Sequence, residues 1–372
     1  MNRLFSILFY TLLICFTSYN SAKTLSIELP PDEIAYMAGQ MMLVGFRGME
    51  ANEDMKIVDD IRERNLGGII LFDYDVPNRE AVRNISSPSQ VERLISQLQS
   101  FAETPLFIAV DQEGGRVNRL KADYGFPLMP SAQDLGQGEY ATTRQVSEEW
   151  GALLSNLGFN INFAPVADVN VNPENPIIGR LGRSFSTDEH IVTEHVAAFI
   201  EGHKSHGVFA TIKHFPGHGS AWNDSHLGMA DVSDTWQDRE LVPFQTLVEN
   251  GKVEMIMTAH IFNAHLDSDF PATLSQNVLT EKLRKDWGYE GIIISDDMQM
   301  KAITEYYGLE EALVLAINAG VDVLIFANNS VYEPDITERA ISIIVENVKN
   351  GTIPQERIVE SYERIMRVKD AF

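Results

Sequence analysis

Eight short apolar runs, separated by longer stretches with helical periodicity, organise most of this chain. The runs occupy residues 41–46, 68–72, 106–111, 160–169, 209–214, 255–260, 291–296 and 322–327. Near-continuous apolar strands that alternate with helices are typical of parallel strands covered by helices. Eight such units in a chain of 372 residues predict an α/β fold, namely a single (β/α)8 barrel of the TIM type.

The segments between the runs support this prediction. Helical periodicity is clear at residues 139–157, 188–206, 235–250, 301–319 and 336–350. An open, doubly wound sheet is the alternative, but no GxGxxG motif follows the first apolar run. No linker-like stretch interrupts the chain, so we expect one domain over residues 23–372. Its last helix, within residues 354–372, is expected to pack on the barrel with a solvated basic face made by Arg357, Arg364, Arg367 and Lys369.

Residues 1–22, MNRLFSILFYTLLICFTSYNSA, are typical of a secretory signal peptide. Arg3 supplies positive charge, residues 4–16 are apolar, and small residues lead to Ala22. Because the apolar run is short for a membrane span, we expect cleavage near Ser21 or Ala22 and an exported protein, periplasmic or secreted. An uncleaved anchor is the alternative. Cleavage removes Cys15, the only cysteine, and with it any disulfide or thiol nucleophile.

The charge balance narrows the expected partners. The formal net charge is −24, from 29 basic and 53 acidic residues. This charge repels phosphate backbones and anionic lipid, so we expect no nucleic-acid partner and no stable membrane insertion once the signal is cleaved. A monomer is the default expectation.

Charged and hydrogen-bonding residues cluster where the apolar runs end. The carboxyl ends of all strands in a (β/α)8 barrel meet at one face, which carries the active site in enzymes of this fold. The residues at or just beyond these ends are Asp111, Glu113, Arg119, Asp168, Arg180, Arg183, Lys213, His214, His260, Asp296 and Asp297. Because the runs themselves are almost purely apolar, this concentration predicts an active site.

The residue types at these ends suit a carbohydrate substrate. Sugar hydroxyls donate and accept hydrogen bonds, and carboxylates and guanidinium groups satisfy both needs. Glycoside hydrolysis also needs a nucleophile or base and an acid for the leaving oxygen. Asp296 ends an apolar run and is therefore a candidate nucleophile on a rigid strand. The alternative is a helix cap at this point, formed by Ser295 or Asp297.

The segment KHFPGHGSAWNDSH, from Lys213 to His226, has three interpretations. It is a metal site, a solvated loop without a role, or a proton-transfer device. The metal ligands on offer, including one at a neighbouring strand end, are His214, His218, Asp224, His226 and His260. Their spacing lacks the helical H-x-x-x-H pattern, and the glycines disfavour a preformed cage. We therefore expect no bound metal.

Proton transfer explains the D-x-H arrangement best. A histidine titrates near neutral pH, so it can donate a proton in one step and accept one in the next. Asp224 can accept the other ring N–H of His226, which fixes the tautomer. We expect His218 to hold the turn through a hydrogen bond. Lys213 and His214 are expected to contact substrate; a buried ion pair with Asp111 or Asp168 is the alternative, and the two roles are compatible.

Three sequence motifs, taken in order, resemble those of glycoside hydrolase family 3. They are AVDQEGGRVNRL, then KHFPGHG followed by DSH, then IISDDM. The resemblance covers essentially all of the mature chain and is strongest to the single-domain β-N-acetylglucosaminidase (β-hexosaminidase) branch, which includes muropeptide-recycling enzymes. It implies a (β/α)8 barrel without the second domain of larger members, and catalysis without a metal or other cofactor.

The resemblance also implies roles for individual residues. Asp296 would form a covalent glycosyl-enzyme intermediate, His226 would be the general acid/base, and Asp224 would orient His226. Asp296 is chosen over its neighbour Asp297 because it aligns with the family's S-D motif. The residues implied to hold the terminal sugar are Asp111, Arg119, Arg183, Lys213 and His214.

We therefore expect a retaining exo-β-N-acetylglucosaminidase that acts on murein fragments or chito-oligosaccharides. One alternative is a phosphorylase or a glucosidase on the same scaffold, because a neutral histidine base does not repel phosphate. Another is a non-catalytic periplasmic sugar-binding barrel, which would have no use for Asp296 beside an Asp–His pair. Murein-recycling members usually work in the cytoplasm, so the predicted export signal does not fit that role.

Overall fold

Within residues 28–371, which the computed structural model describes, eight parallel strands close a barrel. Their order around the barrel is β1–β14–β13–β11–β9–β8–β5–β2, so strands follow one another along the chain and β14 closes on β1. The strands are β1 (Met42–Gly45), β2 (Gly68–Ile70), β5 (Phe107–Val110), β8 (Ile161–Asn162), β9 (Phe209–Phe215), β11 (Met255–Thr258), β13 (Ile292–Asp297) and β14 (Val323–Phe326). The predicted fold and all eight predicted strands are confirmed. The predicted signal peptide lies outside the described residues.

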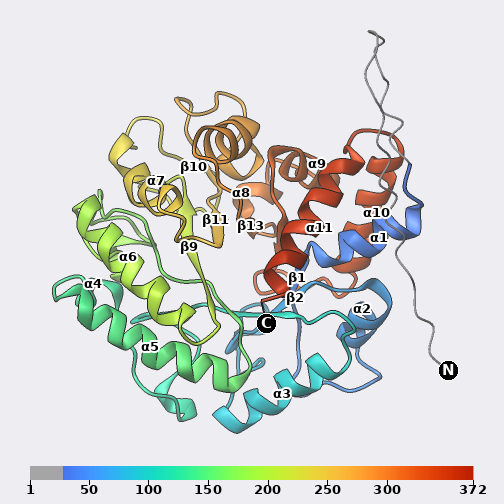
Figure 1. Ribbon diagram of the computed structural model, residues 1–372, viewed down its shortest axis with the longest axis horizontal. Helices are drawn as coiled ribbons and strands as arrows, with labels where there is room; N and C mark the ends of the chain where they lie inside the picture. Colours follow the sequence, from blue (N-terminus) through green and yellow to red (C-terminus); the bar gives the residue numbers. More distant parts are fainter. Residues whose placement is uncertain (1–27, 372) are drawn as a thin grey trace, which may run out of the picture.

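Helices form an outer ring around these strands (Figure 1). The helices are α1 (Pro31–Gln40), α2 (Lys56–Arg64), α3 (Pro88–Ser100), α4 (Ala132–Leu135), α5 (Tyr140–Leu157), α6 (Glu189–Lys204), α7 (Val242–Glu249), α8 (Lys301–Thr304), α9 (Leu309–Ala319), α10 (Ile336–Lys349) and α11 (Gln355–Lys369). A further helical segment covers Asn277–Asp286. In the part of the chain that the structure describes, no helix combines the length and apolarity needed to cross a bilayer.

Short hairpins and paired segments decorate the loops that follow the strands. They are β3 (Tyr74–Asp75) with β4 (Glu80–Ala81), β6 (Gln112–Gly114) with β7 (Val117–Asn118), and β10 (Ala230–Asp231) with β12 (Ile261–Phe262). Each of these segments follows the carboxyl end of a barrel strand, so together they build up the face of the barrel on which this fold carries its chemistry.

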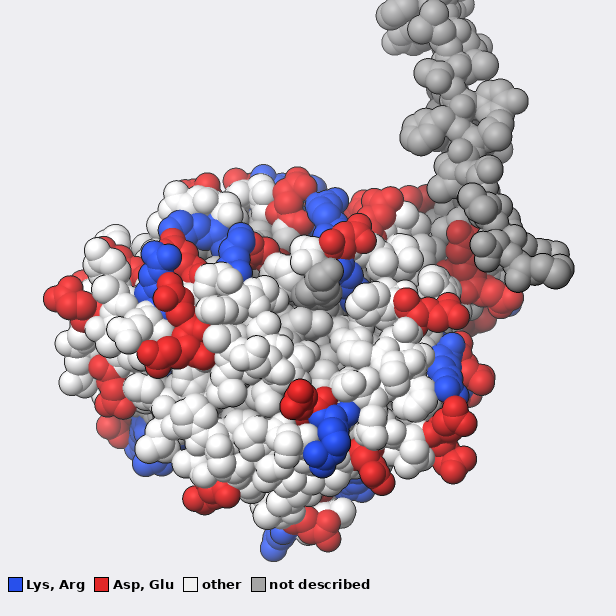
Figure 2. Space-filling model, turned by 60° about the horizontal axis from the view of Figure 1, so that its bottom comes forward, with Lys and Arg blue, Asp and Glu red and all other residues white. Residues whose placement is uncertain are grey.

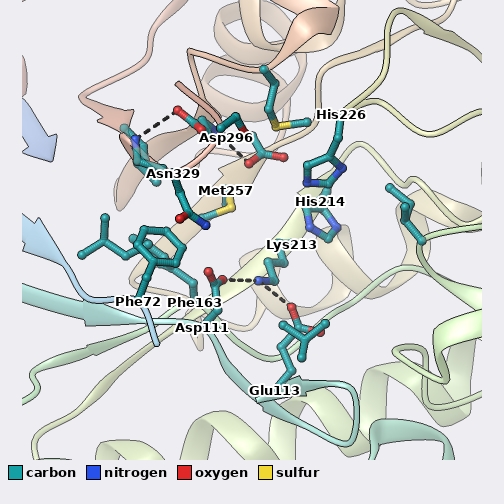
Figure 3. A pocket seen from close by; sticks show the side chains of 18 of the residues that line it. Phe72, Asp111, Glu113, Phe163, Lys213, His214, His226, Met257, Asp296 and Asn329 are labelled. Carbon is teal, nitrogen blue, oxygen red and sulfur yellow. Dashed lines mark hydrogen bonds and ion pairs between the residues drawn. The ribbon is translucent and has the colours of Figure 1, made fainter. Parts of the chain in front are cut away.

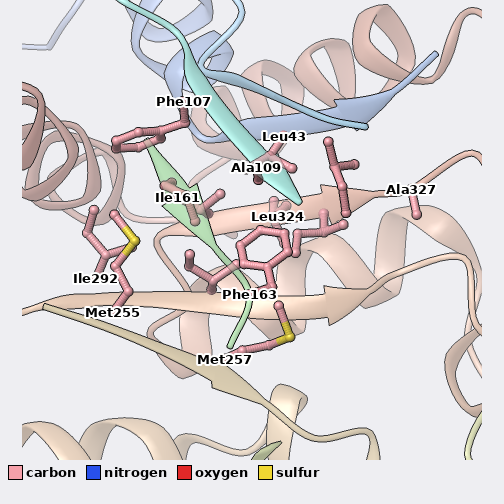
Figure 4. Packing of buried hydrophobic residues seen from close by; sticks show 14 of the residues in the cluster. Leu43, Phe107, Ala109, Ile161, Phe163, Met255, Met257, Ile292, Leu324 and Ala327 are labelled. Atoms are coloured by element: carbon pink, nitrogen blue, oxygen red, sulfur yellow. The ribbon is translucent and has the colours of Figure 1, made fainter. Parts of the chain in front are cut away.

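The barrel interior is a packed apolar core, not a channel. Phe107, Ile161, Phe163 and Met257 project into it from neighbouring strands (Figure 4), and each is at most 3% exposed. Burying a side chain of this size stabilises the fold by roughly 1.5–3 kcal/mol. The core therefore fixes the strand ends, and with them the polar side chains that follow.

Two elements are shorter than the sequence pattern predicts, each for a local reason. The strand predicted over residues 160–169 forms β8, whose ladder ends at Asn162. Pro165 has no N–H to donate, so the chain beyond continues beside β9 through separate hydrogen bonds, such as Ala167 N–H to Lys213 O at 2.7 Å. The helix predicted over residues 301–319 breaks into α8 and α9, and Gly308 lies at the N-cap of α9.

The prediction of a solvated basic face on the last helix is wrong for three of its four residues. Arg357 and Arg364 both reach the fully buried Asp322 at the foot of β14, at 3.0 and 3.1 Å. Lys369 is 3% exposed and donates to Gln40 Oε1 and to the carbonyl of Gly67 at 2.7 Å. Arg367, by contrast, is exposed. Helix α11 therefore closes the amino-terminal end of the barrel with three of its four basic side chains turned inward.

Surface charge is mixed and mainly acidic. Figure 2 shows Asp and Glu gathered around the edge of one face, with Lys and Arg interspersed, and a largely uncharged centre. Many of these charges form exposed pairs such as Arg144–Glu148, at 3.0 Å, which add little stability. The face shown offers no extended basic patch to a polyanion.

Candidate active site

A cavity of about 290 Å³ lies at the carboxyl-terminal face of the barrel, near the lower end of the range for small-molecule sites (Figure 3). Apolar side chains, among them Phe72, Phe163 and Met257, line it beside the polar ones. The predicted site residues that line it are Asp111, Arg119, Arg183, Lys213, His214, His226 and Asp296. Asp224 completes the predicted set through its hydrogen bond to His226. Folding thus brings all of these residues to one place.

A buried network of charges forms one side of the cavity, and we call it the ion-pair wall. Its members are Asp111, Glu113, Asp168, Arg183, Lys213 and His214. Lys213 Nζ lies 2.9 Å from Asp111 Oδ1 and 2.7 Å from Glu113 Oε1. Arg183 donates two hydrogen bonds of 2.8 Å to the same Glu113 carboxylate. The bidentate pair fixes the guanidinium plane as well as its position.

Mutual neutralisation keeps these buried groups ionised. Burial raises the pKa of Glu113, but Arg183 and Lys213 lower it further, so it lies far below its usual range. Burial lowers the pKa of Lys213, but Asp111 and Glu113 raise it above the ordinary value. The wall therefore presents fixed donors and acceptors to a ligand without a cost of reorganisation.

His214 is oriented by Asp168 at the inner end of the wall. Its Nδ1 lies 2.7 Å from Asp168 Oδ2, and its Nε2 lies 3.3 Å from Arg183 Nη2. Asp168 Oδ1 also accepts the backbone N–H groups of His214 and His218, at 3.1 and 2.8 Å. Both ion pairs considered from the sequence, Lys213 with Asp111 and His214 with Asp168, are present, and both basic residues also line the cavity.

Arg119 lies further out than the wall. Its Nη2 is 3.7 Å from Asp111 Oδ2 and its Nη1 is 3.9 Å from Asp73 Oδ1, while 28% of the side chain is exposed. The guanidinium carbon also lies 5.5 Å from the centre of the Phe72 ring. Arg119 is therefore held loosely at the mouth, where it can reach a ligand that enters.

Two consecutive aspartates end β13, and the structure separates them. Asp297 Oδ1 accepts the backbone N–H groups of Gln299 and Ala327 at 3.1 Å, and burial together with Asp296 raises its pKa to about 6. The Asp296 carboxylate instead lies on the His226 side of the cavity (Figure 3). Burial raises its pKa, but His260, His214 and His226 outweigh burial and bring it to about 2. Of the two, Asp296 is thus the ionised carboxylate that faces the histidine.

The loop between β9 and β10, residues 216–229, carries the Asp–His pair, and we call it the histidine loop. His226 Nδ1 lies 2.8 Å from Asp224 Oδ1, which also accepts the His226 backbone N–H at 2.9 Å. Partial burial lowers the pKa of His226, but Asp224 and Asp296 raise it above the ordinary value. Because Asp224 occupies Nδ1, the Nε2 atom is left to exchange a proton with a ligand.

The base of the histidine loop is anchored by buried groups. His218 Nε2 lies 3.1 Å from Ser225 Oγ, and burial lowers the pKa of His218 to about 4. Glu240 accepts the backbone N–H groups of Ser220 and Gln237 at 3.1 Å. Its carboxylate also lies beneath Gly217 and Gly219, where a Cβ atom would approach the Glu240 side chain. The loop is therefore fixed at its start and more exposed toward its tip.

The site residues predicted from the sequence omit four that the structure adds, one of which is Asp168 of the ion-pair wall. Glu113 is marked in the sequence only as a strand-end residue, although it binds both Arg183 and Lys213. His260 lies within 3.0 Å of the Asp297 carbonyl and lowers the pKa of Asp296. Glu240 carries no sequence signal, because it lies in the segment before α7 and is 14 residues beyond His226. The sequence pattern could have found Glu113, Asp168 and His260, because each lies at or just beyond the end of an apolar run.

The histidines of the segment 213–226 face different partners. His214 pairs with Asp168, His218 with Ser225 and His226 with Asp224. Across residues 28–371, no group of three or more His, Cys, Asp or Glu side chains is arranged to hold a metal ion. These partners fit proton transfer at His226, ligand contact at His214 and a structural role at His218.

Comparisons with known proteins agree with this site. The family described as "Glycosyl hydrolase family 3 N terminal domain" matches residues 34–368. Beta-hexosaminidase A of Pseudoalteromonas piscicida is 33% identical over 83% of this chain, and the match spans 54% of that protein. Beta-hexosaminidase of Tolumonas auensis is 36% identical over 77% of this chain and 83% of its own length.

Solved structures show the same likeness in three dimensions. A glycoside hydrolase family 3 beta-N-acetylglucosaminidase from Paenibacillus superposes with a TM-score of 0.82 and 34% identity, over 91% of this chain and 62% of that one. Beta-N-acetylhexosaminidase from Beutenbergia cavernae gives a TM-score of 0.81 at 27% identity, over 91% of this chain and 98% of that one. Fold and relatives together define a barrel glycoside hydrolase. The chain belongs to glycosyl hydrolase family 3.

Proposed function

We propose that this chain is a retaining exo-β-N-acetylglucosaminidase that removes terminal β-linked N-acetylglucosamine from murein fragments or chito-oligosaccharides. One observation carries the proposal: the ionised Asp296 at the end of β13 faces the His226–Asp224 pair across a cavity whose remaining side is the ion-pair wall. Relatives named as beta-hexosaminidases and beta-N-acetylglucosaminidases support the sugar specificity.

In the first step, an Asp296 oxygen attacks the anomeric carbon while the bond to the leaving oxygen breaks. His226 donates its Nε2 proton to that oxygen, and Asp224 stabilises the ring through Nδ1. Proton donation of this kind contributes about 10²–10⁴-fold to rate. The product is a glycosyl ester of Asp296, with the aglycone released as an alcohol.

In the second step, His226 Nε2 takes a proton from water as the water oxygen attacks the anomeric carbon. The bond to Asp296 breaks, the carboxylate returns and the sugar leaves with its original configuration. The ion-pair wall holds the sugar hydroxyls in both steps through Asp111, Lys213, Arg183 and His214. The cavity volume of about 290 Å³ favours binding of one terminal sugar unit, hence exo action.

Export belongs to the same proposal. Residues 1–22 have the pattern of a signal peptide, and a relative from Arthroderma benhamiae, 30% identical over 91% of this chain, is described as an uncharacterized secreted glycosyl hydrolase. A periplasmic or secreted enzyme would meet wall fragments or environmental chitin rather than cytoplasmic recycling intermediates.

Initial rates on an aryl β-N-acetylglucosaminide and an aryl β-glucoside test the activity, with a chelator in a parallel reaction. We expect a strong preference for the N-acetylated sugar, unchanged by the chelator, and release of β-configured N-acetylglucosamine observed by NMR. Cleavage of the plain glucoside alone would contradict the N-acetyl specificity. Loss of activity with chelator would contradict the metal-free mechanism, and no cleavage of either substrate would contradict the proposed function.

A further inference from the structure

Two large apolar side chains on the histidine loop are left in solvent. Trp222 is 63% exposed and Leu227 is 71% exposed, and they flank the Asp224–His226 pair in sequence. Ala221 and Ser225, on the same segment, are buried, so part of the loop is packed while Trp222 and Leu227 face solvent. Single exposed apolar side chains are common on protein surfaces, so what distinguishes these two is their position on the loop that carries the proton donor.

The backbone holds both side chains close to the Asp–His pair. The Ala221 carbonyl accepts a hydrogen bond from Asn172 Nδ2 at 3.0 Å, which fixes the chain just before Trp222. The Leu227 N–H donates to the Asp224 carbonyl at 3.0 Å, which closes a turn around His226. Trp222 is absent from the cavity lining, whereas His226 is part of it. Trp222 therefore lies outside the cavity, on the loop that carries the proton donor.

The chemistry at His226 determines what must occupy this surface. A proton donor has to come within about 3 Å of the leaving oxygen, so the first sugar beyond the cleaved bond lies beside His226. Residues that flank His226 and face solvent are the ones that this sugar meets first. A pyranose ring presents an apolar C–H face, and an indole offers a large, rigid surface for such a face at low entropic cost.

We propose that Trp222 and Leu227 form an aglycone-binding platform for an uncharged pyranose, so that the preferred substrates are chito-oligosaccharides rather than murein fragments. This inference rests on the proposed glycosidase function and adds the substrate class. The platform moves with the proton donor because both are parts of one loop, so binding of the aglycone also positions His226.

The charges around the platform favour an uncharged sugar. Asp224 lies within the loop, and the Glu305 carboxylate lies 3.7 Å from the position that a Cβ atom on Gly228 would take. Lys301, the basic residue of α8, is paired with this Glu305 at 3.6 Å. His226 is likewise paired with Asp224, so neither cation is free to bind the lactyl carboxylate of N-acetylmuramic acid, which the net charge of −24 repels. N-acetylglucosamine carries no charge and is therefore not repelled.

Two substrates that share the cleaved sugar but differ in the leaving group separate the platform from the catalytic centre. Chitotriose extends over the platform, whereas the azide of β-N-acetylglucosaminyl azide is too small to reach Trp222. In Trp222→Ala, kcat/KM for chitotriose is expected to fall about tenfold, as for loss of one stacking contact, and kcat/KM for the azide to stay within about twofold. Trp222→Phe is expected to retain most of the chitotriose activity. Tyr36→Ala, an exposed aromatic on α1 at the opposite end of the barrel, is the matched control and should change neither rate.

Equal losses on both substrates, or no loss on chitotriose, would overturn the platform. The charge argument is tested with the wild-type protein on two disaccharides, N-acetylglucosamine linked β-1,4 to N-acetylglucosamine or to N-acetylmuramic acid. A higher kcat/KM for the neutral disaccharide, with a gap that narrows as salt is added, supports the inference; a higher value for the muramic acid compound overturns it. If the wild type cleaves neither the azide nor the aryl substrate, the proposed function fails instead.

Discussion

The two sides of the cavity are built in opposite ways. In the ion-pair wall the side chains of Glu113, Lys213 and Asp168 are 4%, 3% and 0% exposed, and each makes charged contacts within 3 Å. In the histidine loop the His226 side chain is 54% exposed and has one charged partner, Asp224. One side is a rigid electrostatic template, and the other is a surface loop whose catalytic histidine faces solvent.

The difference follows from the work each side would do. Groups that hold hydroxyl groups act best when their geometry is set before the ligand arrives, which burial and mutual pairing achieve. A group that protonates a leaving oxygen and later deprotonates a water must exchange protons with solvent and admit two partners in turn. Four substitutions test this division, from the largest expected effect to the smallest.

Asp296→Asn removes the proposed nucleophile from the rigid side, and we expect kcat on an aryl β-N-acetylglucosaminide to fall by at least about 10⁴-fold. Asp297→Asn is the matched control. Asp297 Oδ1 accepts hydrogen bonds from two backbone N–H groups, and the amide oxygen of asparagine can still accept both. The kcat of the Asp297→Asn variant should stay within about tenfold of the wild-type value. Equal losses in the two variants would show that the structure does not separate their roles.

Lys213→Met removes the buried cation that Asp111 and Glu113 share, while Glu113 stays paired with Arg183. Breaking a buried pair in this way costs about 3–5 kcal/mol, so the free energy of unfolding should fall by that order, measured by urea titration. Lys204→Met, which breaks the exposed pair with Glu254, should cost less than about 1 kcal/mol. Similar costs for the two variants would mean that the wall is not the preorganised element described above.

Asp224→Asn should move the pH profile without abolishing activity. In wild type, Asp224 and Asp296 raise the pKa of His226, and the first step needs His226 protonated, so kcat/KM falls as pH rises through that raised pKa. An amide removes the negative charge, which shifts this alkaline limb toward acid. An unmoved limb would assign it to another group.

Glu240→Gln is expected to have the smallest effect, which is a change in how thermal stability depends on pH. Burial raises the pKa of Glu240 to about 8, with a further rise from Asp168. A raised folded-state pKa means that the folded chain binds a proton that the unfolded chain has released, so stability falls as pH rises from about 4.5 to 8. The amide of the variant does not titrate, and the Tm difference between variant and wild type should therefore grow in the variant's favour by about 3 °C or more over this range.

The same Tm scans contain their own control. Below about pH 4.5, Glu240 is protonated in both the folded and the unfolded chain, and the two proteins should differ by a constant amount. A difference that is independent of pH up to about pH 8 would show that Glu240 is ionised in the folded protein and anchors Ser220 as a carboxylate.

Sequence periodicity was enough to predict the strands, because each apolar run is short and ends at polar residues. It failed for the details of α8 and α9, where Gly308 interrupts an otherwise continuous pattern, and for β8, where Pro165 removes a ladder donor. Periodicity also failed for α11, where Arg357 and Arg364 have the spacing of a solvated face. Both side chains instead turn inward to Asp322, which lies more than 30 positions earlier at the start of β14.

The sequence by itself determined the order of strands and helices, the polar residues at the strand ends and the D-x-H pair, because these are properties of neighbouring residues. Only the tertiary structure decided which charge pairs with which. Glu113 meets Arg183 across 70 positions, and Asp297 rather than Asp296 is bound by the Ala327 N–H. Such pairings depend on barrel closure, which brings distant strand ends together and sets the burial that makes each pairing strong.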